Sequence, residues 1–280
     1  MRCSGMQFIN ELFSLMTLVK MGSVVLITVA LSLLAESVSP KMAGFLTGFP
    51  LGAAVSIFFM GFEISPNFAA ESALHTSAGV AATVVFSYCY WRVSAAAREL
   101  NCVVQIFLAC LVGSIGYLAA ALILSYFPSN LVLASVLPIL SILIFSRIAR
   151  DIKDVKIDRR VRLSFGLLLV RAFFAASTVV LIISTAKTVG PTWAGLFAAY
   201  PNIMLPLVVI IQFTYMPEHA YVIIKNVPKG LISVISYCLT VSIAYPTFGV
   251  YIGTAMAYGS ATICMLAMQF GNDLFHRSRS

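Results

Sequence analysis

Residues 35–50 read AESVSPKMAGFLTGFP, and residues 186–201 read AKTVGPTWAGLFAAYP. Aligned without a gap, the two stretches share a Pro–x–x–Ala–Gly–x(5)–Pro pattern, and their identical residues lie 151 positions apart. The same spacing pairs Pro66 with Pro217 and Lys20 with Arg171. Chance matches are common in apolar sequence, but two prolines around an Ala–Gly step are a more specific pattern. It predicts an internal duplication.

The composition indicates the solvent in which this duplication folds. Of 280 residues, 60% are hydrophobic and only 10% are charged, whereas soluble domains carry about 25% charged residues. The mean hydropathy is +0.98. A soluble enzyme, a disulfide scaffold, a nucleic-acid-binding domain and a disordered regulator are therefore excluded. The six cysteines form no CxxC pair, so we expect neither a metal site nor a cofactor.

Apolar runs long enough to cross a bilayer, about 20 residues each, predict an all-α integral membrane protein with about nine transmembrane helices. Most prolines lie in the intervening turns, where a missing amide proton costs nothing. The predicted spans are roughly 12–37, 42–62, 77–93, 101–126, 129–147, 163–186, 192–215, 229–245 and 248–269.

The positive charges predict the orientation. With the N-terminus outside and the C-terminus in the cytoplasm, fourteen of the eighteen Lys and Arg residues lie on the cytoplasmic side, as the positive-inside rule requires. The net charge of +8 then follows from membrane topology, with no nucleic-acid partner. Residues 146–162 form the most charged linker. We expect a multi-pass protein of a bacterial inner membrane.

The repeat spacing and the span count together predict an inverted repeat. Five spans separate equivalent helices, so the second unit is upside down relative to the first. Residues 1–126 would form the first repeat with spans one to four. Residues 127–162 would hold the connecting span and the charged cytoplasmic loop, and residues 163–280 the second repeat and a short tail. Such repeats are a feature of secondary transporters, whose sites lie near the midplane between interrupted helices.

Each half also resembles the GlpM-like family of small inner-membrane proteins. The resemblance rests on a basic residue in an apolar helix, a short loop, an Ala–Gly step and a proline six residues after the glycine. These are Lys20, Ala43–Gly44 and Pro50 in the first half, and Arg171, Ala194–Gly195 and Pro201 in the second. The resemblance covers two or three spans of each half and implies architecture more than chemistry.

Lys20 and Arg171 are the first candidates for a binding site. Each lies eight residues into its predicted span, which is about 12 Å deep in a core of roughly 30 Å. A charge at that depth is costly and is functional by default. Two such cations beside one repeat interface would suit an anion. The alternative is that both side chains extend to the interface from spans that begin later.

The two Ala–Gly–x(5)–Pro elements are the second candidate. Gly44 and Gly195 allow helices to approach closely, and Pro50 and Pro201 interrupt the backbone ladder so that polar groups could face a ligand. Asn202 adds a polar side chain directly after the second proline. The alternative is a kink that serves only packing.

These features predict a permease that moves a small anion or an anionic lipid head group by alternating access. Glu63, beside the second span, could carry a coupling proton, or belong to an interfacial acidic loop. A non-catalytic anchor or assembly subunit of an envelope biosynthesis or export complex is the alternative function. The protein would work in the lipid bilayer, as a homodimer or within a membrane complex. No catalytic motif is present, so we do not expect an enzyme.

Overall fold

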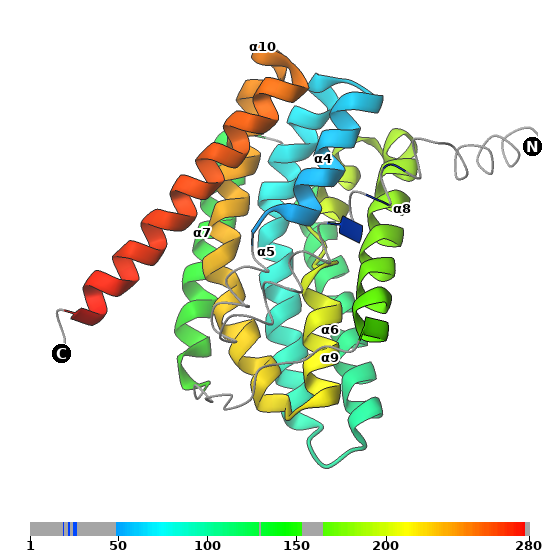
Figure 1. The fold of residues 1–280 in the computed structure, drawn as a ribbon, viewed down its shortest axis with the longest axis vertical. Coiled ribbons are helices and arrows are strands. Elements are labelled where there is room, and N and C mark those ends of the chain that lie inside the picture. The colour runs from blue at the N-terminus through cyan, green and yellow to red at the C-terminus, as the bar shows by residue number, and fades with distance from the viewer. Residues whose placement is uncertain are drawn as a thin grey trace, which may run out of the picture.

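The computed structural model describes residues 49–128, 130–152 and 165–277 and the isolated positions 19, 22, 25 and 26. Side chains of residues 165, 167, 168, 171 and 270–277 lie outside this description. The described residues form helices and short turns without a strand (Figure 1). The helices are α4 (Leu51–Glu63), α5 (Pro66–Ala96), α6 (Cys102–Ser125), α7 (Leu131–Ile148), the short η1 (Ala149–Asp151), α8 (Phe165–Ala198), α9 (Met204–Thr214) and α10 (Pro217–Arg277).

Among the described residues, four helical segments are long and apolar enough to cross a membrane. They are Cys102–Ser125, Leu131–Asp151, Ala172–Ala198 and Pro217–Gln269. Only 28% of the first and 22% of the second is buried, so α6 and α7 expose apolar side chains over most of their surface. Water would oppose that exposure and lipid would not. The prediction of an all-helical chain compatible with a membrane is confirmed at this level.

The last helix, α10, consists of two arms. Gly249 interrupts it with a φ of 78°, a left-handed conformation that favours glycine. The chain reverses direction near the end of the bundle, so that the second arm returns alongside the molecule (Figure 1). Gly190 interrupts α8 in the same way, with a φ of 79°, and Pro191 follows it.

The centre of the bundle is α5, which packs against α4, α6, α7, α8 and α10. Its buried polar residues are Ser72, His75, Thr76, Ser77, Thr83, Ser87 and Ser94. Helix α5 thus buries polar side chains at the centre of the bundle, within a core that is otherwise mostly apolar. These side chains can form hydrogen bonds with the helices packed around α5.

Two predicted spans are too short. The span expected at 77–93 belongs to α5, which begins at Pro66 with Ser65 as its cap, since the Ser65 hydroxyl accepts a hydrogen bond from the Phe68 amide over 3.1 Å. The span expected at 229–245 belongs to the first arm of α10, which begins at Pro217. Hydropathy does not predict where these two helices begin, because the first turns of both helices are rich in polar residues. Many of these residues face other helices instead of water.

Candidate functional site between two interrupted helices

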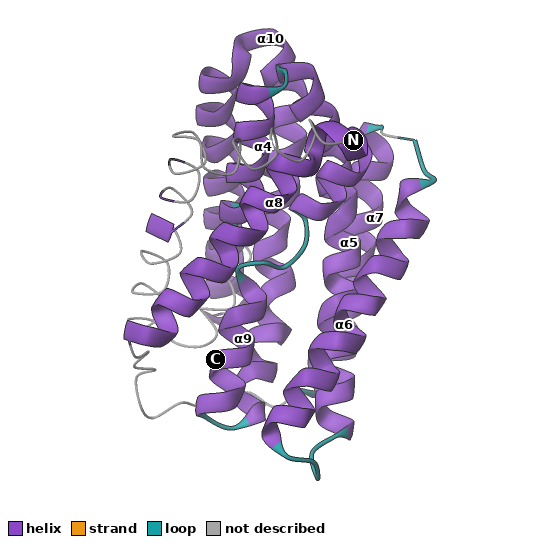
Figure 2. Cartoon of the chain, turned by 90° about the vertical axis from the view of Figure 1, so that its right-hand side faces the viewer, coloured by secondary structure: helices purple, strands orange, loops and turns teal. Residues whose placement is uncertain are grey.

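The span predicted at 192–215 is interrupted in its middle. Helix α8 ends at Ala198, and the chain runs through Tyr200, Pro201 and Asn202 before α9 begins at Met204. The eight residues from Pro191 to Ala198 and the eleven of α9 correspond to about 12 Å and 16 Å of helix. The interruption therefore lies near the midpoint of the span, and Figure 2 shows a loop at mid-height in the bundle.

The carbonyl groups on the α8 side of the interruption are hydrogen-bonded to side chains of neighbouring helices. On α5, the Thr76 hydroxyl donates to the Gly195 carbonyl over 2.9 Å, and the Thr83 hydroxyl donates to the Ala199 carbonyl over 2.7 Å. On α6, the Tyr117 hydroxyl donates to the Leu196 carbonyl. Three carbonyls at the end of α8, where a helix leaves such groups unpaired, thus accept hydrogen bonds from side chains.

No side chain accepts from the amide groups on the other side of the interruption, where the Leu205 amide donates to the Pro201 carbonyl over 2.8 Å and Pro206 has no amide proton. Helix α9 begins after Ile203, and no side chain caps it. Helix α4 begins after Pro50, again without a side-chain cap. The first amide protons of a helix give its N-terminus a partial positive charge. Neither helix therefore has a side-chain cap at its positive end.

These two ends lie against each other. A Cβ placed on Gly52, in the first turn of α4, would lie 2.6 Å from Oδ1 of Asn202 and 3.1 Å from Cδ1 of Ile203. Only a glycine permits this approach. From the meeting point α4 extends toward one end of the molecule and α9 toward the other (Figure 1), so the two helices point their N-termini at one region.

A cavity of about 50 Å³ occupies that region. Asn202 lines it, and its side chain is only 4% exposed. Its amide nitrogen, Nδ2, is buried and has no hydrogen-bond partner among the described residues. A buried donor left without a partner costs about 1–3 kcal/mol. The lining residues are Phe49, Pro50, Gly52, Ala53, Val80, Thr83, Ala198, Ala199, Tyr200, Pro201, Asn202, Ile203, Met204, Val227, Leu231 and Val234.

The structure brings together three of the residues predicted from the sequence, because Pro50, Pro201 and Asn202 all line this cavity. Gly195 lies instead in the contact between α8 and α5, where a Cβ would meet the Ser72 carbonyl oxygen at 2.2 Å.

The remaining predicted residues do not meet at the cavity. Lys20, Gly44 and the side chain of Arg171 lie outside the described residues. Glu63 is the last residue of α4, about 16 Å along the helix from Gly52, and the acidic loop expected beside it is mostly the first turns of α5. Its role in proton coupling stays a prediction.

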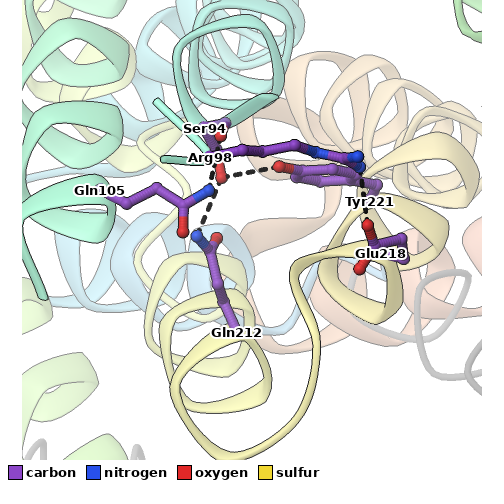
Figure 3. A network of polar contacts seen from close by, with 6 residues as sticks. All are labelled: Ser94, Arg98, Gln105, Gln212, Glu218 and Tyr221. Atoms are coloured by element: carbon purple, nitrogen blue, oxygen red, sulfur yellow. Dashed lines mark hydrogen bonds and ion pairs between the residues drawn. The ribbon is translucent and has the colours of Figure 1, made fainter. Parts of the chain in front are cut away.

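A second polar cluster, which the sequence did not reveal, joins α5, α6, α9 and α10 at one end of the bundle (Figure 3). Tyr90 donates to Oε1 of Gln212 over 2.8 Å, and Nε2 of Gln212 donates to the Ser94 hydroxyl over 2.8 Å. The Ser94 hydroxyl also lies 3.0 Å from the Tyr221 hydroxyl. Nε2 of Gln105 donates to the Ser94 carbonyl over 2.6 Å. Gln212 is fully buried.

Beside this cluster lies a wider cavity of about 430 Å³, lined by Trp91, Ala95, Arg98, Asp151, Ile152, Glu218 and Tyr221. Arg98 and Glu218 form an ion pair across it with an N–O distance of 2.7 Å. Among the described residues no group of three His, Cys, Asp or Glu side chains could hold a metal ion.

Comparison with known proteins adds nothing to these observations: no family model, no curated protein and no solved structure matches the chain. The functional conclusion therefore depends on the geometry of the cavity.

Proposed function

We propose that this chain is a membrane permease that moves a small anion or an anionic lipid head group by alternating access. The observation that carries the proposal is the cavity at which two uncapped helix N-termini and the unpartnered amide of Asn202 meet. Irregular backbone at membrane depth is tolerated where it lines a cavity, and half-helix N-termini that point at an anionic group are a recurrent feature of secondary transporters.

The order of elements supports an inverted repeat. Pro50 and Pro201 each precede a short helix, and Pro66 and Pro217 are the first residues of the long helices that follow. All of these equivalent positions are 151 residues apart. The chain direction of α5 is opposite to that of the first arm of α10 (Figure 1), as an inverted second unit requires. In this proposal the Gly249 break corresponds to the turn between α5 and α6.

The proposal includes nine spans, with α4 and α9 as the second halves of interrupted spans and the arms of α10 as two separate spans. It places the C-terminus and the end with Arg98 in the cytoplasm of a bacterial cell. Lys20 and Arg171 remain proposed anion ligands, because a cation at the repeat interface would add its charge to the two helix ends.

The experiment is an uptake assay with the purified full chain in liposomes. Radiolabelled chloride, formate and phosphate test small anions, and a fluorescent phosphatidylglycerol with an impermeant quencher tests lipid head groups. We expect protein-dependent transport of at least one probe, reduced in Lys20→Ala and Arg171→Ala variants. Transport of none of these probes, together with a stoichiometric partner on purification, would favour the assembly-subunit function instead.

A further inference from the structure

The chemistry of the central cavity decides the sign of the charge that it can bind. The donors nearest to it are Nδ2 of Asn202 and the amides of Gly52, Ala53 and Met204 in the first turns of α4 and α9, whereas the Leu51 and Leu205 amides already donate to the Phe49 and Pro201 carbonyls. The nearby carbonyls of Gly195 and Ala199 already accept hydrogen bonds from α5. Among the described residues that line the cavity none is a carboxylate. An anion there would accept a hydrogen bond from Nδ2 of Asn202 and would meet the positive ends of α4 and α9.

The size of the cavity limits the ligand further. Its volume is about 50 Å³, and roughly 10–15 Å³ of such space holds one water molecule. An ion of about four heavy atoms fits such a volume, whereas a lipid phosphate with its glycerol does not. The apolar neighbours Val80, Val227, Leu231 and Val234 leave little room for a hydration shell.

None of the described residues that line the cavity has a charged side chain, so this part of the site offers a ligand only partial charges. Desolvation cost rises steeply with ionic charge, and amide donors supply only partial charges in return. A singly charged anion loses much less hydration free energy than a doubly charged phosphate. The described lining therefore favours a singly charged anion, and Lys20 and Arg171 are proposed to meet the anion elsewhere at the repeat interface.

We infer that the cavity between α4 and α9 binds one small monovalent anion, of the size of chloride, nitrate or formate, with Nδ2 of Asn202 as the side chain that selects it. This inference rests on the proposed function and narrows it, because it excludes the lipid head group. Gly52 is a positioning residue, since its missing Cβ lets the Asn202 side chain lie against the first turn of α4.

The first experiment measures binding. The detergent-solubilised full chain is titrated with sodium formate, nitrate, chloride or phosphate, with sodium gluconate keeping the ionic strength constant, and its melting temperature is recorded. We expect the three monovalent anions to raise the melting temperature and phosphate to leave it unchanged. Asn202→Leu removes a donor that lacks a partner, so it should melt at least as high as the wild type without anion and lose the anion-dependent rise.

The matched control is Asn226→Leu. Asn226 is also a buried asparagine, but its Nδ2 already donates to the Val222 carbonyl over 2.8 Å. This variant should melt lower than the wild type and keep the anion-dependent rise. Asn202→Asp keeps the shape of the side chain and replaces the donor by a carboxylate. It takes the place of Asn202→Leu in the titration if Asn202→Leu does not fold. We expect either substitution at position 202 to weaken anion binding about 10- to 100-fold.

Uptake of radiolabelled formate, chloride and phosphate by the same variants separates this inference from the proposed function. Formate or chloride uptake that is lost in Asn202→Leu and kept in Asn226→Leu supports both. Small-anion uptake that is unchanged in Asn202→Leu and Asn202→Asp overturns the site but leaves the permease function. Movement of the fluorescent lipid alone, or a preference for phosphate, overturns the small monovalent anion. Transport of no probe overturns the permease function itself.

Discussion

Replacing Gly195 by alanine should separate α8 from α5. The new Cβ would lie 2.2 Å from the Ser72 carbonyl oxygen and 2.8 Å from Cβ of His75, and ordinary contact begins at 3.4 Å. Because the first obstacle is backbone, the two helices must move apart by about 1 Å. The hydrogen bond from Thr76 to the Gly195 carbonyl, now 2.9 Å long, would then lie beyond bonding distance.

The size of the effect follows from these two losses. Overpacking of a tight contact costs about 1–3 kcal/mol, and one buried hydrogen bond contributes about 0.5–1.5 kcal/mol. Alanine recovers about 0.5–1 kcal/mol because glycine is unfavourable inside a helix. We therefore expect Gly195→Ala to lower the free energy of unfolding by about 2–3 kcal/mol.

The assay is unfolding of the purified protein in mixed micelles by titration with sodium dodecyl sulfate, followed by circular dichroism. Gly259→Ala is the matched control, because a Cβ at that helical position has no neighbour within 4 Å. The control should be neutral or slightly stabilised. Equal stability of Gly195→Ala and Gly259→Ala would refute the proposed close contact between α8 and α5.

Two further predictions concern the polar cluster at the end of the bundle. Gln212→Leu leaves the buried hydroxyl of Tyr90 without its acceptor and removes the donor to Ser94, so the free energy of unfolding should fall by about 2–4 kcal/mol in the same titration; a change below about 0.5 kcal/mol would contradict the network. Arg98→Ala breaks an ion pair whose side chains are 54% and 36% exposed. It should cost less than about 1 kcal/mol, and a loss as large as that of Gln212→Leu would show that the Arg98–Glu218 pair is shielded from solvent.

Part of this arrangement could be predicted from the sequence because it depends on local chemistry. A proline cannot continue a hydrogen-bond ladder, so Pro50 and Pro201 marked the interruptions without any knowledge of the fold. Asn202 stood out because a polar residue follows such a proline inside an apolar run. The apolar surfaces of α6 and α7 were visible in the same way, since lipid-facing helices need no polar face.

The remaining features of the fold and of the site depend on contacts between segments that are distant in the sequence. Gly52 matters only because Asn202 lies against it, and 150 residues separate them in the chain. A low hydropathy does not predict the start of α5 as part of a membrane helix. Its serines and threonines are nevertheless buried, because they bond to carbonyls of α8, α7 and α5 itself. Gln212 bonds to Tyr90 and Ser94, which are 122 and 118 residues away in the chain, so no local pattern indicates that network.

The hydrogen bonds from α5 have a mechanical consequence for the interrupted helix. Thr76 and Thr83 hold the last turn of α8, and Tyr90 and Ser94 hold the far end of α9 through Gln212. Both fragments are thus attached to one rigid rod, which fixes their separation although no continuous backbone ladder joins them. Substitution of Thr76, Tyr90 or Ser94 would therefore change the separation of the two fragments, although none of these three residues lines the cavity.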